Sequence, residues 1–189
     1  LADANRTDQA SSGKALKIPA SANPALIWDL YAGAMTLIEN KDNLIPVGRL
    51  DKVRIATVAV NRLAMTEFQR MTDRYTNADH FYIDPENEQA AGYVFSKLKD
   101  YDIVIAGICG LAQKPSSSYG VTQPLRNVVS RLAEMDRSVI LWFGNPYGVA
   151  NLDLKVRPSA MLIAYQDNKY THQTSVQEAC PMLQGHRKL

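Results

Sequence analysis

The sequence is poor in the features that mark metal-binding, membrane and nucleic-acid-binding proteins. Its 189 residues include only two cysteines, Cys109 and Cys180, and three histidines, and their spacing fits neither a zinc site nor a disulfide framework. No apolar stretch approaches the roughly 20 residues that a membrane-spanning helix needs. The formal net charge of +2 gives no basic surface for a phosphate backbone. We therefore predict no metal site, no membrane span and no nucleic-acid partner.

The motifs of several common α/β proteins are missing as well. The segment AVNRLAMTE (59–67), after the first predicted strand, contains no glycine for a dinucleotide-binding turn. In GICGLAQKP (107–115), Ala112 stands where a phosphate-binding P-loop needs its second glycine. A phosphoacceptor receiver domain needs an aspartate where Ala106 and Gly107 end the third predicted strand, and neither GxSxG nor HExxH occurs. These absences predict a protein without a nucleotide or other cofactor.

Short apolar runs alternate with amphipathic segments along most of the chain. Strands are predicted at 53–60, 80–84, 102–107, 138–144 and 160–165. Strands that are apolar on both faces and separated by helices are typical of a parallel sheet that is covered on both sides. The predicted fold is therefore α/β, a three-layer α/β/α sandwich with a mostly parallel sheet of five or six strands. Residues 1–22 are predicted to form a linker or extended arm, and residues 23–189 a single domain.

Helices are predicted where apolar residues recur every three or four positions. Asn23 and Pro24 are expected to begin a helix over residues 24–39, and Thr122 to cap a later one. A further helix is expected to start at the Asp-Pro-Glu sequence of residues 84–86. The last helix carries an apolar stripe of Val176, Ala179, Cys180 and Leu183, which Pro181 should kink or end.

Ligands of open α/β sheets bind beyond the carboxyl ends of the strands, so the loops there hold the candidate site residues. These candidates, for a ligand crevice or an interface, are Asn61, Arg62, Gly107, Cys109, Gly110, Ser117, Tyr119, Asn145 and Tyr147. No catalytic residue is predicted among them.

The loop of residues 107–122 holds no group suited to acid or base catalysis near neutral pH. Between Asp102 and Glu134 the sequence has neither a carboxylate nor a histidine, and serines at 116–118 would need an adjacent base to act as nucleophiles. The loop is interpreted either as a flexible, hydroxyl-rich connection or as a surface that hydrogen-bonds a sugar or peptide through its serines and Tyr119.

Cys109 and the segment that contains Tyr147 each have two interpretations. Cys109 is either a small buried apolar residue or a reactive thiol. In FGNPYGV (143–149), the Asn-Pro turn favours a rigid corner, while Tyr147 could stack on a sugar or a partner. His80 and His172 are expected to be surface or capping residues rather than ligands.

The order of several segments resembles the carboxyl-terminal domain of glycoside hydrolase family 3. These segments are AGAMTLIENKDNLIPV, VRIATVAV, YDIVIAGI, SVILWFGNPYGV, AMLIAYQDN and SVQEACPMLQG, which ends at Gly185. The resemblance covers residues 24–185. It implies an α/β sandwich that packs beside a TIM-like catalytic barrel of the same polypeptide, in a β-glucosidase or β-N-acetylglucosaminidase that is periplasmic or secreted.

At one position this sequence departs from the family's pattern. In many β-glucosidases of the family, the loop after the third strand of the sandwich supplies the acid/base glutamate, and here that loop has no glutamate. Either the acid/base residue lies in the barrel, which resembles the N-acetylglucosaminidase branch with its His–Asp pair, or this copy is a non-catalytic support. In both cases the chain is expected to be a fragment of a larger enzyme, inactive by itself, whose partners are the catalytic barrel and a carbohydrate. An apolar patch near residues 24–39 would mark the contact with the barrel.

Two other functions remain open from the sequence. The chain could be a free-standing, flavodoxin-like module that binds a small ligand or a protein. It could also be an independent enzyme that uses Cys109 or a serine, which would require a lowered thiol pKa or a base from elsewhere in the fold.

Overall fold

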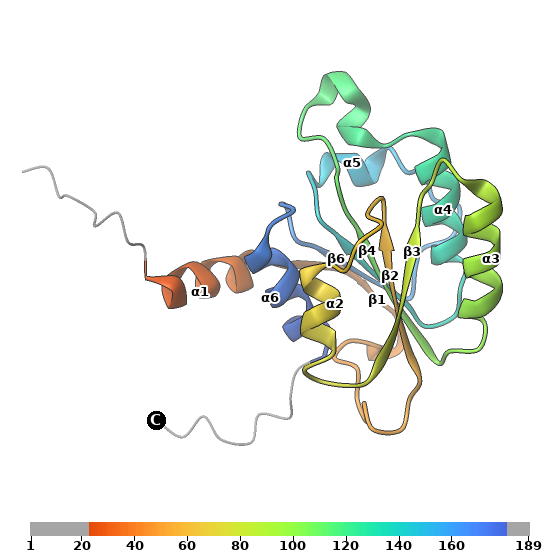
Figure 1. Ribbon diagram of the computed structural model, residues 1–189. Coiled ribbons are helices and arrows are strands. Elements are labelled where there is room, and N and C mark those ends of the chain that lie inside the picture. The colour runs from red at the N-terminus through yellow and green to blue at the C-terminus, as the bar shows by residue number, and fades with distance from the viewer. Residues whose placement is uncertain (1–22, 181–189) are drawn as a thin grey trace, which may run out of the picture.

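The protein forms a six-stranded sheet with helices on both of its faces (Figure 1). The computed structural model describes residues 23–180, so the predicted arm at 1–22 and Leu183 lie outside the described residues. The strands are β1 (Thr36–Asn40), β2 (Ile55–Val60), β3 (Ala78–Ile83), β4 (Ile103–Ile108), β5 (Ser138–Trp142) and β6 (Ala160–Ile163). Their order across the sheet is β1-β6-β5-β4-β2-β3.

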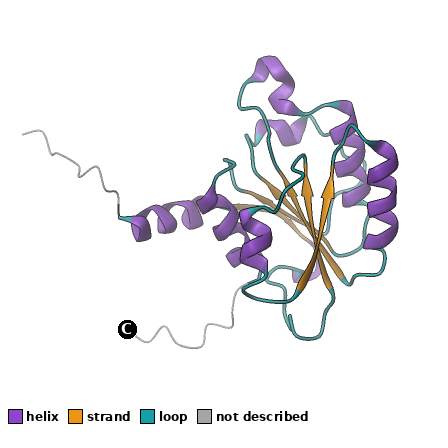
Figure 2. Ribbon diagram, viewed as in Figure 1, coloured by secondary structure: helices purple, strands orange, loops and turns teal. Residues whose placement is uncertain are grey.

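The sheet is parallel except at one edge. β2, β3, β4, β5 and β6 pair in parallel, whereas β1 pairs antiparallel with β6. β3 is the opposite edge of the sheet. The parallel strands place their carboxyl ends, and the loops that follow them, along one side of the molecule (Figure 2).

Two sets of helices form the outer layers. The α-helices are α1 (Pro24–Ala34), α2 (Glu67–Thr72), α3 (Glu88–Leu98), α4 (Gln123–Ala133), α5 (Tyr147–Ala150) and α6 (Lys169–Ala179). Apolar residues of α3 and α4 pack on one face of the sheet, and those of α2 and α6 pack on the other. Two short 3-10 helices, η1 (Lys41–Asn43) and η2 (Pro115–Gly120), lie in connecting loops.

Alternation along the strands explains why both faces are covered. In β4, Val104 and Ala106 belong to the core beneath α3 and α4, whereas Ile103 and Ile105 belong to the core beneath α2 and α6. Successive side chains of a strand point to opposite faces, so an uninterrupted apolar run needs a partner layer on each side. The predicted three-layer α/β sandwich is confirmed.

The first predicted helix is too long. Residues 24–34 are helical, but Thr36–Asn40 form β1, with a bulge between Leu37 and Glu39. The apolar spacing of 24–39 suits a helix, yet pairing with β6 satisfies the backbone of the last residues and adds a strand to the sheet. The predicted helix cap at Asn23 is confirmed, because its side chain accepts a hydrogen bond from the Ala25 N–H at 3.0 Å.

Other boundaries differ by a few residues. Thr122 caps α4 as predicted, but α3 begins at Glu88 with Asn87 as its cap, rather than at residues 84–86. α6 ends at Ala179, before Pro181, as the loss of a backbone donor at proline requires. None of the described helices is both long and apolar enough to span a bilayer.

Candidate functional site

The loops at the carboxyl ends of the strands meet around one carboxylate, that of Asp167. It lies in the connection between β6 and α6, and its side chain is 17% exposed. Oδ2 accepts hydrogen bonds from the Gly110 N–H at 2.8 Å and from Arg62 Nη2 at 3.0 Å, and Oδ1 accepts one from His172 Nε2 at 2.8 Å. Asp167 therefore connects the loops that follow β2, β4 and β6.

The protonation of Asp167 follows from these contacts. Burial alone raises the pKa of the carboxyl, but the hydrogen bonds from His172, Gly110 and Arg62 together lower it well below its usual value. Asp167 is thus held as an anion at neutral pH. A carboxylate in this state can orient a cation or accept hydrogen bonds, but it cannot donate a proton to a leaving group.

His172 is a buried member of the same group, which corrects the expectation of a surface or capping residue. Its ring stacks on Phe143, with 3.9 Å between ring centroids and 23° between planes. Because an ionised carboxylate only accepts hydrogen bonds, Nε2 is the atom that donates to Asp167. Nδ1 is buried and has no hydrogen-bond partner among the described residues.

Cys109 lies next to this pair but is fully buried. Burial raises the pKa of its thiol far above the ordinary value, and the Asp167 charge raises it further. A potential ligand atom of Cys109, one of Asp167 and one of His172 lie within 4.8 Å of one another, a set that zinc could use. However, Arg62 and the Gly110 N–H already occupy the carboxylate, so hydrogen bonds satisfy it without an ion.

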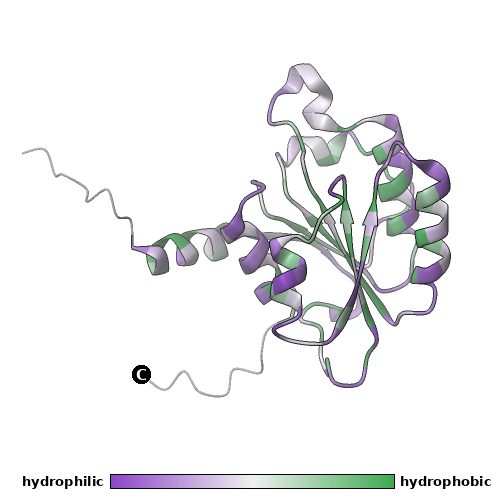
Figure 3. Cartoon of the chain, in the orientation of Figure 1, coloured by the Kyte–Doolittle hydropathy of each residue, from purple (hydrophilic) through white to green (hydrophobic). Residues whose placement is uncertain are grey.

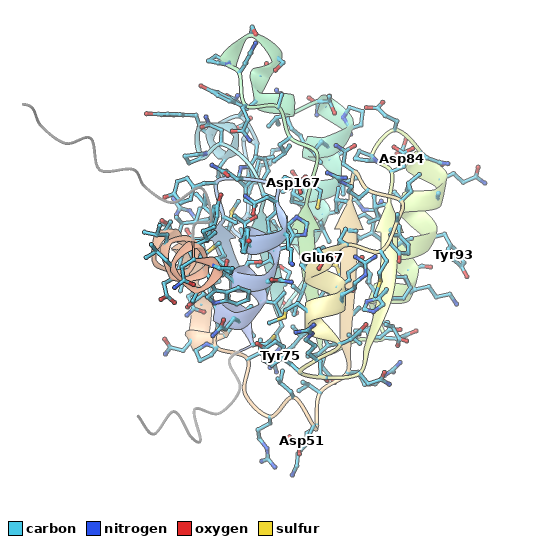
Figure 4. The ribbon with its side chains drawn as sticks, turned by 60° about the vertical axis from the view of Figure 1, so that its left-hand side comes forward. Asp51, Glu67, Tyr75, Asp84, Tyr93 and Asp167 are labelled. Carbon is cyan, nitrogen blue, oxygen red and sulfur yellow. The ribbon has the colours of Figure 1, made fainter. Side chains whose placement is uncertain are left out.

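A cavity of about 310 Å³ lies beside Asp167, between the β2–α2 loop and the start of α6. Glu67 and Asp167 are the carboxylates that line it, and Figure 4 labels both. Each is paired with an arginine: Glu67 Oε1 lies 2.7 Å from Arg70 Nη1, and Asp167 Oδ2 lies 3.0 Å from Arg62 Nη2. Both carboxylates are therefore placed to hold cations rather than to act as a general acid.

A second group of candidate residues is an aromatic pair. The rings of Tyr119 and Tyr147 stack, with 6.2 Å between centroids and 27° between planes. Asn145 Oδ1 accepts a hydrogen bond from the Tyr147 N–H at 3.0 Å, and the Asn145 carbonyl accepts one from Trp142 Nε1 at 3.0 Å. The Asn-Pro corner thus holds Tyr147 beside η2.

The structure places the nine candidates of the sequence in four settings. Four of them, namely Asn61, Arg62, Cys109 and Gly110, surround Asp167, and the Asn61 amide donates to the Cys109 carbonyl at 3.1 Å. A further three form or support the aromatic pair: Tyr119, Asn145 and Tyr147. Ser117 is exposed in η2, where its hydroxyl donates to the Lys114 carbonyl, and Gly107 lies inside β4 against Phe68.

The sequence reasoning missed Asp167 and His172 as a pair. A usable indication was present, because Asp167 follows the last apolar strand directly and His172 stands five residues later, in the first turns of the next helix. Their meeting with Arg62 and Gly110 depends on the order of strands in the sheet, which local spacing does not specify.

Comparison with solved structures confirms the family resemblance at the level of the fold. The chain matches a fungal multi-domain GH3 β-N-acetylglucosaminidase with a TM-score of 0.61 and 19% identity, covering 82% of this chain. It matches a glycoside hydrolase family 3 β-N-acetylglucosaminidase from Paenibacillus sp. str. FPU-7 with a TM-score of 0.61 and 13% identity over 93% of this chain. A β-glucosidase from Listeria innocua gives 0.58 and 12% identity over 79%.

The matches cover only a part of those proteins. This chain spans 17% of the fungal enzyme, 33% of the Paenibacillus enzyme and 24% of the Listeria enzyme. No protein-family model and no curated protein sequence matches the chain. This chain and these enzymes therefore share a fold, and their sequence identities are too low to infer a shared activity.

Proposed function

We propose that this chain is the accessory α/β domain of a family 3 β-glycoside hydrolase. In this proposal it packs beside a TIM-like catalytic barrel of the same polypeptide, its strand-end loops form part of the sugar site, and it has no glycosidase activity alone. Two findings support the proposal: the shared fold with family 3 enzymes, and the small fraction of those enzymes that the chain spans.

The observation that carries the proposal is the uncovered apolar surface of the segment formed by α1 and β1. Of nine large apolar side chains exposed in the described residues, four lie in this segment: Leu26 (56%), Leu30 (65%), Leu37 (44%) and Ile38 (40%). α1 extends away from the sheet, and Figure 3 shows apolar residues along it. No residue of α1 is buried.

A helix with this pattern needs a partner. Leu26 and Leu30 are four residues apart and therefore share one face of α1. On another side of α1, Tyr31 stacks on Tyr170 of α6 with 5.8 Å between centroids, and its hydroxyl donates to Gln166. Among the described residues, α1 is thus attached to the domain on one side only, and a neighbouring domain would bury the leucines on the other side.

The chemistry of the strand-end loops also supports an accessory role. Retaining glycosidases need two carboxyl groups about 5–5.5 Å apart, and one must carry a proton near neutral pH. The cavity at the strand ends has Glu67 and Asp167, each bound to an arginine, and the pKa of Asp167 is lowered rather than raised. A catalytic acid would then come from the barrel.

The test is the Leu30→Glu substitution in two contexts. In this chain alone, the free energy of unfolding should change by less than about 0.5 kcal/mol, because the side chain is 65% exposed and Glu is a good helix former. In the complete polypeptide that includes the barrel, the same substitution buries a charge at the interface. It should lower the melting temperature and the activity on nitrophenyl β-glycosides.

Tyr93→Glu is the matched control, because Tyr93 is also 65% exposed on a helix, α3, of the opposite layer. It should have a small effect in both contexts. If Leu30→Glu leaves the complete polypeptide as stable and active as the Tyr93→Glu variant, the α1–β1 segment does not contact the barrel and the proposal fails.

A free-standing binding module is the second candidate, and the cavity beside Asp167 is the observation that favours it. A small anionic or hydroxyl-bearing ligand could bind Arg62 there. Saturable binding of a nucleotide in calorimetric titration, with loss of binding in Arg62→Gln, would favour this function over the accessory role.

A further inference from the structure

We propose that the Tyr119–Tyr147 pair is a carbohydrate-binding surface that holds the flat face of a neutral pyranose ring on Tyr147. This inference rests on the proposed function, because that function is the reason for choosing a sugar among neutral ligands. The binding itself is a property of this chain, and it does not require the catalytic barrel to be present.

The geometry leaves one aromatic face open. Tyr147 is 70% exposed, although its ring contacts that of Tyr119, which is half-buried. At 6.2 Å between centroids the two rings touch each other, so a ligand ring cannot lie between them. A ligand would therefore pack on the outer face of Tyr147, with Tyr119 as the support behind it.

The pair is held in place by the backbone around it. A Cβ at Gly148 would lie 3.2 Å from the Tyr119 Cβ and 2.9 Å from the Trp142 ring, so only glycine allows this approach. Asn151 Nδ2 donates to the Ser118 carbonyl at 3.4 Å, which connects α5 to η2. A ring fixed in this way loses little conformational freedom when a ligand binds.

The backbone of η2 supports a functional role for the pair. Ser118 and Tyr119 have φ values of 50° and 57°, in the left-handed region that residues other than glycine rarely adopt. Such conformations persist where the surrounding structure fixes them, and they cluster at binding sites.

The surrounding side chains favour a neutral, hydroxyl-rich ligand. The two stretches that form the surface, PSSSYG (115–120) and NPYGVAN (145–151), contain no side chain that is charged near pH 7. They offer serine and tyrosine hydroxyls and two asparagine amides, which both donate and accept hydrogen bonds. A pyranose ring has a face of C–H bonds for the aromatic ring and a rim of hydroxyls for these groups.

The experiment is saturation-transfer NMR of this chain with methyl β-D-glucoside, methyl N-acetyl-β-D-glucosaminide, cellobiose and chitobiose. We expect saturation of the ring C–H protons of at least one of them, with millimolar affinity. Tyr147→Ala should weaken binding by about tenfold or more, because it removes the aromatic face. Tyr147→Phe should keep most of the binding, because the ring remains.

Tyr93→Ala is the control, because Tyr93 is an exposed tyrosine of similar accessibility on another part of the surface, where Figure 4 labels it. No saturation with any of the four sugars, or equal losses in the Tyr147→Ala and Tyr93→Ala variants, would overturn the inference. Self-association of the chain that depends on Tyr147, measured by sedimentation, would also overturn it and make the pair a protein interface. The two proposals can fail separately. If Leu30→Glu proves harmless in the complete polypeptide while this chain still binds a sugar through Tyr147, the proposed function fails and this inference stands.

Discussion

Asp167 is the residue on which the arrangement of the strand-end loops most depends. Its two oxygens accept hydrogen bonds from three different segments, those of Arg62, Gly110 and His172. An ionised carboxylate forms stronger hydrogen bonds than a neutral amide does, so the charge itself contributes to holding the loops.

We predict that Asp167→Asn lowers the free energy of unfolding by about 1–3 kcal/mol, measured by urea denaturation at pH 7. The variant keeps the side-chain shape and one acceptor oxygen, but loses the ion pair with Arg62 and one of the hydrogen bonds. Asp136→Asn serves as the control, because Asp136 is exposed and no ion pair involves it among the described residues.

The pH dependence of this difference follows from the lowered pKa of Asp167. A carboxyl group whose pKa is lower in the folded state contributes its full stability above the unfolded pKa, near 3.8. The contribution decreases as pH falls below that value toward the folded pKa. The gap between wild type and Asp167→Asn should therefore be constant from pH 5 to 7 and shrink below about pH 4. A gap that widens on acidification would contradict this assignment.

At this scale the sequence located the loops at the strand ends but did not show which side chains meet there. The order of apolar runs located Arg62, Cys109 and Gly110 at strand ends, because parallel strands place their carboxyl ends together. The loop of residues 107–122 has no carboxylate of its own. The carboxylate beside that loop belongs to Asp167, which lies far away in the sequence, and only the strand order brings it there.

At the scale of the elements, β4 and α2 approach each other closely where Gly107 faces Phe68. Gly107 lies in β4 directly under the fully buried Phe68 of α2, and an added Cβ would lie 2.5 Å from the Phe68 ring. The glycine near the end of the strand therefore serves close packing rather than a turn or a ligand contact.

We predict that Gly107→Ala lowers the free energy of unfolding by about 1–3 kcal/mol, because the buried Phe68 ring, which packs beside Phe143 and His172, would have to shift. Gly92→Ala is the matched control in α3, where no atom lies within 4 Å of the added Cβ. There the replacement should stabilise the protein by about 0.5–1 kcal/mol, since alanine favours a helix more than glycine does. Thermal unfolding followed by circular dichroism measures both. Equal effects at the two positions would show that the Phe68 contact is not as close as described.

The spacing of apolar residues predicted the existence of strands and helices more reliably than it predicted their first and last residues. All five predicted strands exist, and four of them, β2, β4, β5 and β6, are apolar runs that are buried on both faces. The sixth, β1, was read as the end of a helix, since Leu37 and Ile38 fit either spacing. Only the antiparallel partner β6, more than a hundred residues away, decides between the two.

For the whole molecule, the proposed function assigns catalysis to the barrel and a supporting role to this chain. We predict that the purified chain does not hydrolyse nitrophenyl β-glucoside or nitrophenyl N-acetyl-β-glucosaminide above the rate in buffer. The reason is that the strand-end cavity offers only carboxylates that are bound to arginines. The measurement is nitrophenol release across pH 4–8, with an authentic β-glucosidase as a positive control. Turnover that disappears in Asp167→Asn would show that this chain contains its own active site.

The position of β3 at the rim of the sheet has a consequence for solubility. An edge strand offers free backbone groups to which a strand of another molecule can add, which is a common start of aggregation. β3 carries Asp79, whose carboxylate accepts a hydrogen bond from the Tyr101 hydroxyl at 2.7 Å, and His80, which lies 3.0 Å from Asp73. A strand that added at this rim would have to remove water from these polar groups. The edge therefore disfavours fibril-like stacking of copies, although the strands inside the sheet are almost entirely apolar.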